Sequence, residues 1–267
     1  GPLARSMAAW LEYWERWGQT WEFQALLKAR RVAGDEVLGT RFLHAAEDFV
    51  HAGYPRDVEA LLIVELDGPE AEVDDLLARV SEIASKNNST TLKVSTSEDE
   101  RLMFWAGRKA AFPAAGRISP DYYCMDGTIP RKNLAQVLLG IAQMEIKYGL
   151  RCANVFHAGD GNLHPLILFD ANQADEFHRA ELFGEEILAL CVEVGGTITG
   201  EHGVGIEKIG SMCVQFSPLE IAAFIAVKRA FDPAFLLNPD KAIPTLQRCA
   251  EYGKMRVSGG QMKFADL

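Results

Sequence analysis

The sequence predicts an α+β domain built on a mainly antiparallel sheet with helices on one face. From Glu59 onward, segments typical of strands alternate with segments typical of helices. Their order, strand–helix–strand–strand–helix–strand, is one that folds into a single sheet with two packed helices. The composition agrees: of 267 residues, 48% are hydrophobic and 24% are charged, which suits a globular chain of one large or two modest domains.

The first part of the chain is expected to be mostly helical. A helix is predicted over 5–30, where four tryptophans spaced by 4, 3 and 4 residues share one helix face. Residues 59–66 (EALLIVEL) are typical of a buried strand, and residues 90–95 of a shorter one. Helical periodicity covers 70–87 and 98–112, each with a proline next to one end.

The later part of the chain supplies the expected sheet. A proline at position 130 suits the start of a helix and a glycine at position 149 suits its end. Residues 232–244 are rich in turn formers, and residues 251–267 carry little pattern. The predicted elements are strands over 121–129, 152–157, 162–169 and 197–199, and helices over 130–148, 174–194 and 218–230.

Charge and cysteine usage exclude several classes. The net charge is −10, from 37 acidic and 27 basic residues, and such a surface repels nucleic acid. No apolar run reaches the roughly 18 residues of a membrane span, and the first residues, GPLARSM, lack the apolar core of a signal peptide. The five cysteines are scattered and form no CxxC pair, so we expect no disulfide framework and a reducing, cytoplasmic location.

Two glycine-rich turns carry the residues suited to metal chemistry. His157 and His164 flank the turn in VFHAGDGNLHP, and Glu201 and His202 lie in GGTITGEHGVG. Two imidazoles and one carboxylate (His157, His164, Glu201) suit zinc, manganese or ferrous iron and leave positions open for a substrate. His202 is then free to act as an acid–base group. The alternative is that these histidines are ordinary, satisfied core residues, and Asp160 is better interpreted as a turn former.

Arginine and aspartate residues before these turns are further candidates. Arg108 lies in FWAGRKAAFPAAGR and can bind an anionic substrate bidentately, whereas Arg117 is better explained by an exposed ion pair. Asp121 and Asp126, on the next predicted strand, could line a pocket, although their pattern alone is a weak signal.

Four long motifs resemble the C-terminal half of FAD-linked 2-hydroxy-acid oxidoreductases, the family that includes glycolate oxidases and D-lactate dehydrogenases. The resemblance runs from about Ala45 to the C-terminus and implies a ferredoxin-like α+β substrate or cap domain. The motifs, in order, are FWAGRKAAFPAAGRISPDYYCMDGTIPR, HAGDGNLHPLILFD, GGTITGEHGVGIEKI and AFDPAFLLNPDKAIPTL.

The resemblance also implies roles for individual residues. A small 2-hydroxy acid would be oxidised to a 2-oxo acid, with hydride passing to FAD and the hydroxyl proton to His202. Arg108 would bind the substrate carboxylate, and Asn162 and Asn238 would lie near the flavin. The implied ligands of a divalent metal are His157, His164 and Glu201. Family members pass electrons to iron–sulfur partners or membrane carriers, so flavin-binding and iron–sulfur subunits are the expected partners.

Two departures from that family shape the expectations. Too few residues precede Glu59 to form the FAD-binding domain, so the chain alone is expected to be inactive. Residues 1–43 instead resemble a fragment of glutamine-synthetase adenylyltransferase, which implies a helical extension of foreign origin over 1–44 and an oxidase domain over 45–267. Two alternatives stay open at this point: a mononuclear metal-dependent hydrolase acting through bound water, and an inactive fusion fragment.

Overall fold

A computed structural model describes most of the chain after its first segment. The predicted helix over 5–30 and the residues after 250 lie outside the described part, so those predictions stay as they were. The described residues are 40–58, 61–63, 66, 68–87, 89–157, 160–245 and 249.

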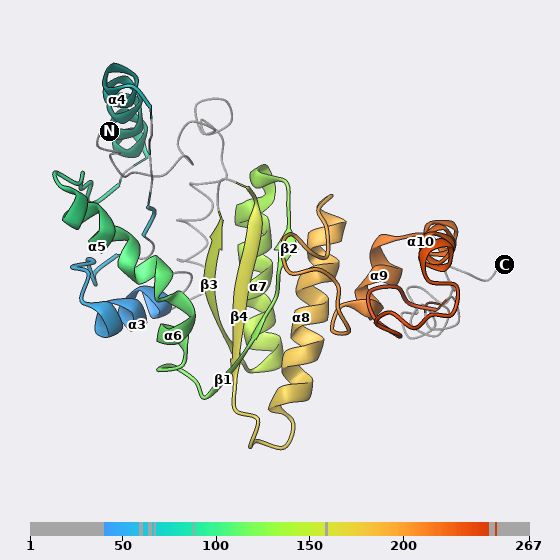
Figure 1. Ribbon diagram of the computed structural model, residues 1–267. Coiled ribbons are helices and arrows are strands. Elements are labelled where there is room, and N and C mark those ends of the chain that lie inside the picture. The colour runs from blue at the N-terminus through green and yellow to red at the C-terminus, as the bar shows by residue number, and fades with distance from the viewer. Residues whose placement is uncertain are drawn as a thin grey trace.

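An antiparallel sheet forms the centre of the molecule, with β4 as its middle strand (Figure 1). On one side β4 pairs with β3, and on the other it pairs with β1 and β2. Thr197 adds an antiparallel bridge to Thr128 at the outer edge. With a helix inside each half, this is the βαββαβ order of a ferredoxin-like fold, so the predicted fold class is confirmed. The strands are β1 (Asp121–Cys124), β2 (Gly127–Thr128), β3 (Arg151–His157) and β4 (Asn162–Phe169).

Two long helices, α7 (Leu134–Tyr148) and α8 (Glu176–Glu193), lie side by side along one face of the sheet (Figure 1). A short 3-10 turn, η1 (Arg131–Asn133), precedes α7, and Gly149 ends that helix in the left-handed conformation, as predicted. Among the described residues, no helix is both long and apolar enough to span a membrane. The main core lies between these helices and the sheet, and its fully buried members include Val137, Ile141, Leu163, Ile167, Phe183 and Ile187.

The second face of the sheet is also covered, which corrects the expectation of helices on one face alone. Three shorter helices lie there: α3 (Thr40–Val50), α5 (Glu98–Lys109) and α6 (Ala111–Ala115). Small side chains let these helices approach the sheet closely, because alanines of α3 and α6 meet Ala153 and Val155 of β3. Every residue of β4 is buried as a result, as expected for a strand covered on both faces.

Helix α3 spans the boundary that the sequence predicts at residue 44. Arg41, in its first turn, forms an ion pair with Glu145 of α7 at 2.8 Å. Leu43 is buried as well. These contacts tie the end of the predicted extension to the sheet domain. The origin of residues 1–39 stays a prediction, since they lie outside the described part of the chain.

Several predicted elements differ from the structure. Helix α4 (Glu70–Lys86) is confirmed, with Pro69 at its start. The described residues of 59–66 and 90–95 form no strand beyond a single bridge at Leu66, and Leu61 is exposed, so the predicted buried strand there is wrong. The predicted helix over 98–112 divides into α5 and α6 at position 110, and the strand over 121–129 divides into β1 and β2 around a buried aspartate.

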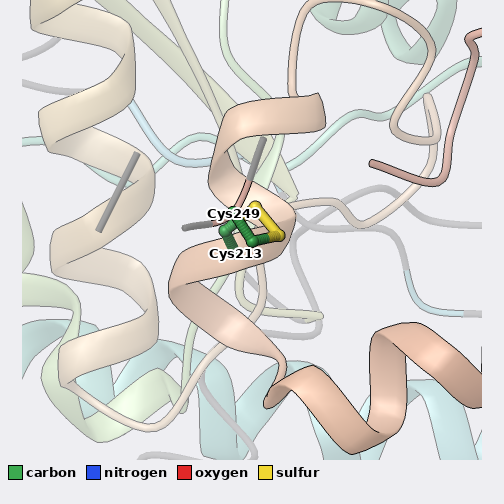
Figure 2. Close-up of a disulfide and its surroundings, with 2 residues drawn as sticks. All are labelled: Cys213 and Cys249. Atoms are coloured by element: carbon green, nitrogen blue, oxygen red, sulfur yellow. A yellow bond between two sulfur atoms is a disulfide. The ribbon is translucent and has the colours of Figure 1, made fainter. Parts of the chain in front are cut away.

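The C-terminal helices lie beyond α8, at the end of the molecule away from α3 (Figure 1). Helix α9 (Ile209–Gln215) has no counterpart in the prediction, whereas α10 (Pro218–Phe231) is confirmed and is capped by the hydroxyl of Ser217. Cys213 of α9 forms a disulfide with Cys249 (Figure 2). The expectation of no disulfide was therefore wrong for this pair. The two cysteines are 36 residues apart, and only the fold brings them together.

Candidate metal centre

The β3–β4 hairpin places two histidines on one face of the sheet. Alternate residues of a strand share a face, and Ala153 and Val155 point toward the alanine-lined helices, so His157 points that way too. The same parity puts His164 on that face of β4, where Val155 is its pairing partner. The two imidazole rings meet edge to face, with centroids 5.3 Å apart. The hairpin therefore brings both predicted ligands together.

Glu201 reaches the same point from the turn after the Thr197 bridge. Its Oε1 lies 3.3 Å from Nε2 of His157, and its Oε2 lies 3.7 Å from Nε2 of His164. One donor atom from each of the three residues lies within 4.8 Å of the others. Ligands bound at 2.0–2.1 Å in tetrahedral geometry are about 3.4 Å apart, so these spacings fit a single small divalent cation.

One candidate ligand is buried and the other two are partly exposed to solvent. The side chain of His164 is 3% exposed, whereas those of His157 and Glu201 are 41% and 51% exposed. Burial lowers the pKa of His164, and the nearby carboxylates of Glu201 and Asp126 only partly oppose this effect. The neutral imidazole, which is the form that binds a metal, is therefore favoured. Water and small molecules can still approach along the exposed side.

The other predicted chemical groups border this centre. The His202 ring stacks on His164, with centroids 5.1 Å apart and planes 17° from parallel. Arg108 comes from α5, and its Nη2 lies 3.4 Å from Nε2 of His157. Burial lowers the pKa of Arg108 and the charge of Glu201 raises it, so this guanidinium is partly desolvated beside a carboxylate. An imidazole and a guanidinium thus flank one candidate metal position.

The two asparagines predicted to lie near flavin are placed differently. Asn162 pairs with His157 across the hairpin and is buried, and neither Nδ2 nor Oδ1 of its amide has a hydrogen-bond partner in the described structure. A buried amide without partners is able to hydrogen-bond a ligand, and the place of Asn162 near flavin stays a prediction. Asn238 is exposed, with a positive φ of 44°, in the segment that follows α10. Within the described residues, no hydrogen bond or ion pair joins it to the candidate ligands.

A second group of possible ligands shares His164. Cys124, His164 and His202 also offer donor atoms within 4.8 Å of one another. Burial raises the pKa of Cys124 to about 12. A bound cation would itself deprotonate the thiol, so this group stays a second candidate set beside the one with Glu201.

Sequence reasoning undervalued the residue that organises the Glu201 turn. Asp126 is fully buried, and its carboxylate accepts hydrogen bonds from the backbone N–H groups of Glu201 and His202. Lys208, also buried, contacts the same carboxylate at 3.2 Å. One feature of the sequence could have pointed to this role: Asp126 lies inside a predicted strand. A charged side chain in such a place is buried only when other groups pair with it.

A family model and several curated proteins are similar to this chain. Residues 16–242 match the model for FAD linked oxidases, C-terminal domain. The chain is 60% identical to glycolate oxidase subunit GlcD of Escherichia coli K12, over 88% of this chain and 47% of that protein. It is 28% identical to a probable mitochondrial D-lactate dehydrogenase of Danio rerio, over 82% of this chain and 44% of that protein. The chain therefore spans about half the length of these curated relatives.

A solved structure gives the same fold at low sequence identity. The 4-ethylphenol oxidase of Gulosibacter chungangensis, in its isoeugenol complex, superposes with a TM-score of 0.54 at 15% identity. The match covers 70% of this chain and 39% of that enzyme. At this identity the likeness supports the fold and carries no information about substrate.

Proposed function

The chain belongs to the family of FAD-linked oxidase C-terminal domains, and on that premise we propose that it is the substrate- and metal-binding half of an FAD-dependent 2-hydroxy-acid oxidoreductase. The substrate is a small acid of the glycolate or D-lactate type. The observation that carries the proposal is the convergence of His157, His164 and Glu201 beside a free imidazole and a guanidinium. The hydrolase alternative would use the same ligand set, and family membership disfavours it.

Each residue has a part in this reaction. Arg108 binds the substrate carboxylate with its two terminal nitrogens and so orients the α-carbon. His202, exposed and stacked on His164, accepts the proton of the α-hydroxyl group. The buried amide of Asn162 is available to bind the cofactor. His157, His164 and Glu201 would hold a divalent cation (zinc, manganese or ferrous iron), which would supply polarisation of the hydroxyl group, and FAD would supply the hydride acceptor.

Assembly and location are part of the proposal. The E. coli relative is named as a subunit, which supports association with other chains. We expect a flavin-binding region and an iron–sulfur electron-transfer subunit as partners, and little FAD retained by this chain alone. An intense flavin absorbance from the purified chain would contradict the last point. A cytoplasmic location stays a prediction. Counting the free thiols of the native protein tests it, because a reducing compartment would leave Cys213 and Cys249 as thiols.

Metal binding is the direct test of the site. The metal-free chain, titrated with Zn²⁺ or Mn²⁺ in a calorimeter, is expected to take up one equivalent. His164→Ala should abolish the uptake, because it removes the buried donor. His178→Ala is the matched control, since that histidine is 72% exposed on α8 and pairs only with Glu181 among the described contacts. A wild-type chain that takes up no divalent cation would refute the metal-binding part of the proposal.

A further inference from the structure

We propose that Asp126 and Lys208 form a buried positioning pair that fixes the backbone of residues 199–202 and thereby aims Glu201 and His202 at the metal centre. No described hydrogen bond or ion pair joins either side chain to the donor atoms of His157, His164 or Glu201, so the pair acts through the backbone it holds. The inference rests on the proposed function, because that function gives Glu201 and His202 their roles.

The carboxylate of Asp126 binds every residue of the turn. Its Oδ2 accepts hydrogen bonds from the hydroxyl of Thr199 at 2.8 Å, from the N–H of Gly200 at 3.1 Å and from the N–H of His202 at 2.9 Å. Its Oδ1 accepts from the N–H of Glu201 at 3.1 Å. Successive N–H groups converge on one anion only in a narrow range of backbone angles. The turn is therefore held in one conformation by one side chain.

Lys208 supplies the charge that makes this arrangement stable. Its Nζ lies 3.2 Å from Oδ2 of Asp126, 3.2 Å from the Asp126 carbonyl oxygen and 3.4 Å from Oγ1 of Thr199. Both charged side chains are almost fully buried, and a buried ion left without its partner is strongly destabilising. Lys208 directly precedes α9, so this helix sets the position of the ammonium group.

The opposing effects on Asp126 resolve in favour of the charged form. Burial alone raises the pKa of Asp126, but the hydrogen bonds from His202, Thr199 and Glu201 and the charge of Lys208 outweigh it. The pKa of Asp126 is well below its usual range as a result. The geometry agrees, since this carboxylate accepts four hydrogen bonds and lies beside a buried ammonium group, a setting that suits its charged form.

The turn also has no room to adopt another position against the sheet. A Cβ added to Gly200 would lie 2.6 Å from Oδ1 of Asn162 and 2.6 Å from Oγ1 of Thr128. The turn is thus clamped between β4 and β2 on one side and Asp126 on the other. By contrast, His157 and His164 are fixed by the hairpin and do not depend on this clamp. Loss of the clamp should weaken metal binding without removing the two-histidine part of the site.

The test compares Asp126→Asn with a matched control in the full chain. Asp232→Asn makes the same change in a second buried aspartate, which accepts the N–H groups of Leu236 and Leu237 and pairs with Lys228 at 2.7 Å. Cobalt(II) is the probe, because its visible absorption reports the number and type of its ligands. Asp126→Asn is expected to weaken Co²⁺ binding by 10–100-fold and to change its spectrum, whereas Asp232→Asn should leave both unchanged.

Lysine variants supply a second route if Asp126→Asn fails to fold. Lys208→Met removes the charge and keeps the stem, and should also weaken Co²⁺ binding, whereas Lys208→Arg should recover part of the loss. A folded Asp126→Asn or Lys208→Met chain with wild-type affinity and a wild-type spectrum would overturn the proposal.

Hydrogen exchange separates this inference from the proposed function. In the metal-free chain, the amides of Gly200, Glu201 and His202 should exchange slowly, and Asp126→Asn should remove that protection while Asp232→Asn does not. If the wild-type chain binds no Co²⁺, the proposed function fails, and the exchange result still decides whether Asp126 holds the turn. Unchanged protection in Asp126→Asn would refute the positioning role.

Discussion

The β3–β4 hairpin and the 199–202 turn deliver their side chains to one point by different means. The hairpin is fixed by continuous antiparallel pairing, and β4 is buried along its whole length. The turn has no repeating backbone pairing and depends on a single buried carboxylate, that of Asp126. Many weak contacts therefore hold the two histidines, whereas few strong ones hold Glu201 and His202. The hairpin should tolerate single polar changes better than the turn does.

The largest expected effect on stability comes from the core beneath the hairpin. Leu166→Ala removes a fully buried side chain between β4 and the alanine-lined helices, and should lower the free energy of unfolding by about 2–5 kcal/mol. Urea unfolding measures this loss. Metal affinity of the folded fraction should change little, because the backbone pairing of His164 remains. Leu219→Ala, at a side chain that is 83% exposed, is the control and should have almost no effect.

Breaking the Cys213–Cys249 bond should destabilise the region that follows the turn. The disulfide closes a segment with a sequence separation of 36 residues, and the chain-entropy model assigns such a crosslink about 3–4 kcal/mol. Cys249→Ser should lower the free energy of unfolding by up to this amount and make unfolding insensitive to dithiothreitol. Metal affinity should fall much less than in Asp126→Asn, because the hairpin and Asp126 itself are untouched. Five reactive thiols in unfolded, unreduced wild-type protein would contradict the bond.

Gly200→Ala should lower stability less than Leu166→Ala or Cys249→Ser, and should lower metal affinity more than either. The new methyl group would meet Asn162 and Thr128, so the turn must shift away from β4. We expect metal affinity to fall about tenfold, as for loss of a residue that orients a ligand, with about 1–3 kcal/mol of destabilisation. Gly116→Ala is the control, because its Cβ would make only an ordinary 3.4 Å contact. Equal affinity in the two variants would show that the turn is not clamped.

As the pH falls, His164 in the hairpin should reduce the stability of the fold before Asp126, which holds the turn, does so. The pKa of His164 is lowered from 6.5 in the folded chain, so the unfolded chain binds the proton first and stability falls as the pH drops below about 6.5. The pKa of Asp126 is lowered from 3.8, so its stabilising effect is complete above about pH 4 and is lost only below it. Urea unfolding of the metal-free chain across this range should show both phases. His164→Gln should remove only the phase below about pH 6.5. If that phase persists in the variant, it does not come from His164.

The same contrast explains what could be predicted from the sequence. Strand alternation and proline and glycine punctuation are local signals, and they correctly predicted β3, β4, α7 and α8. The candidate ligands were found because histidines beside glycine-rich turns are unusual. In the structure, three of those side chains do converge.

Long-range partnerships left no such signal. The ion pair of Asp126 and Lys208 joins residues 82 positions apart, and the Cys213–Cys249 bond joins residues with no recognisable spacing motif. The strand over 121–129 divides opposite Pro165 of β4, which lacks the N–H that an unbroken ladder needs, while the register stays the same on both sides of the gap. Local propensity describes neither contact, since each depends on the completed fold.

The alternation of side chains along β4 restricts how this domain can change over time. Leu163 and Ile167 fill the core beneath α7 and α8, whereas His164 and Leu166 belong to the opposite face. One residue inserted after His164 would reverse the face of every residue that follows it, so Ile167 would leave the main core and Leu166 would enter it. Insertions in the hairpin loop cause no such exchange, so we expect related domains to vary the length of the loop and to keep the length of the strand.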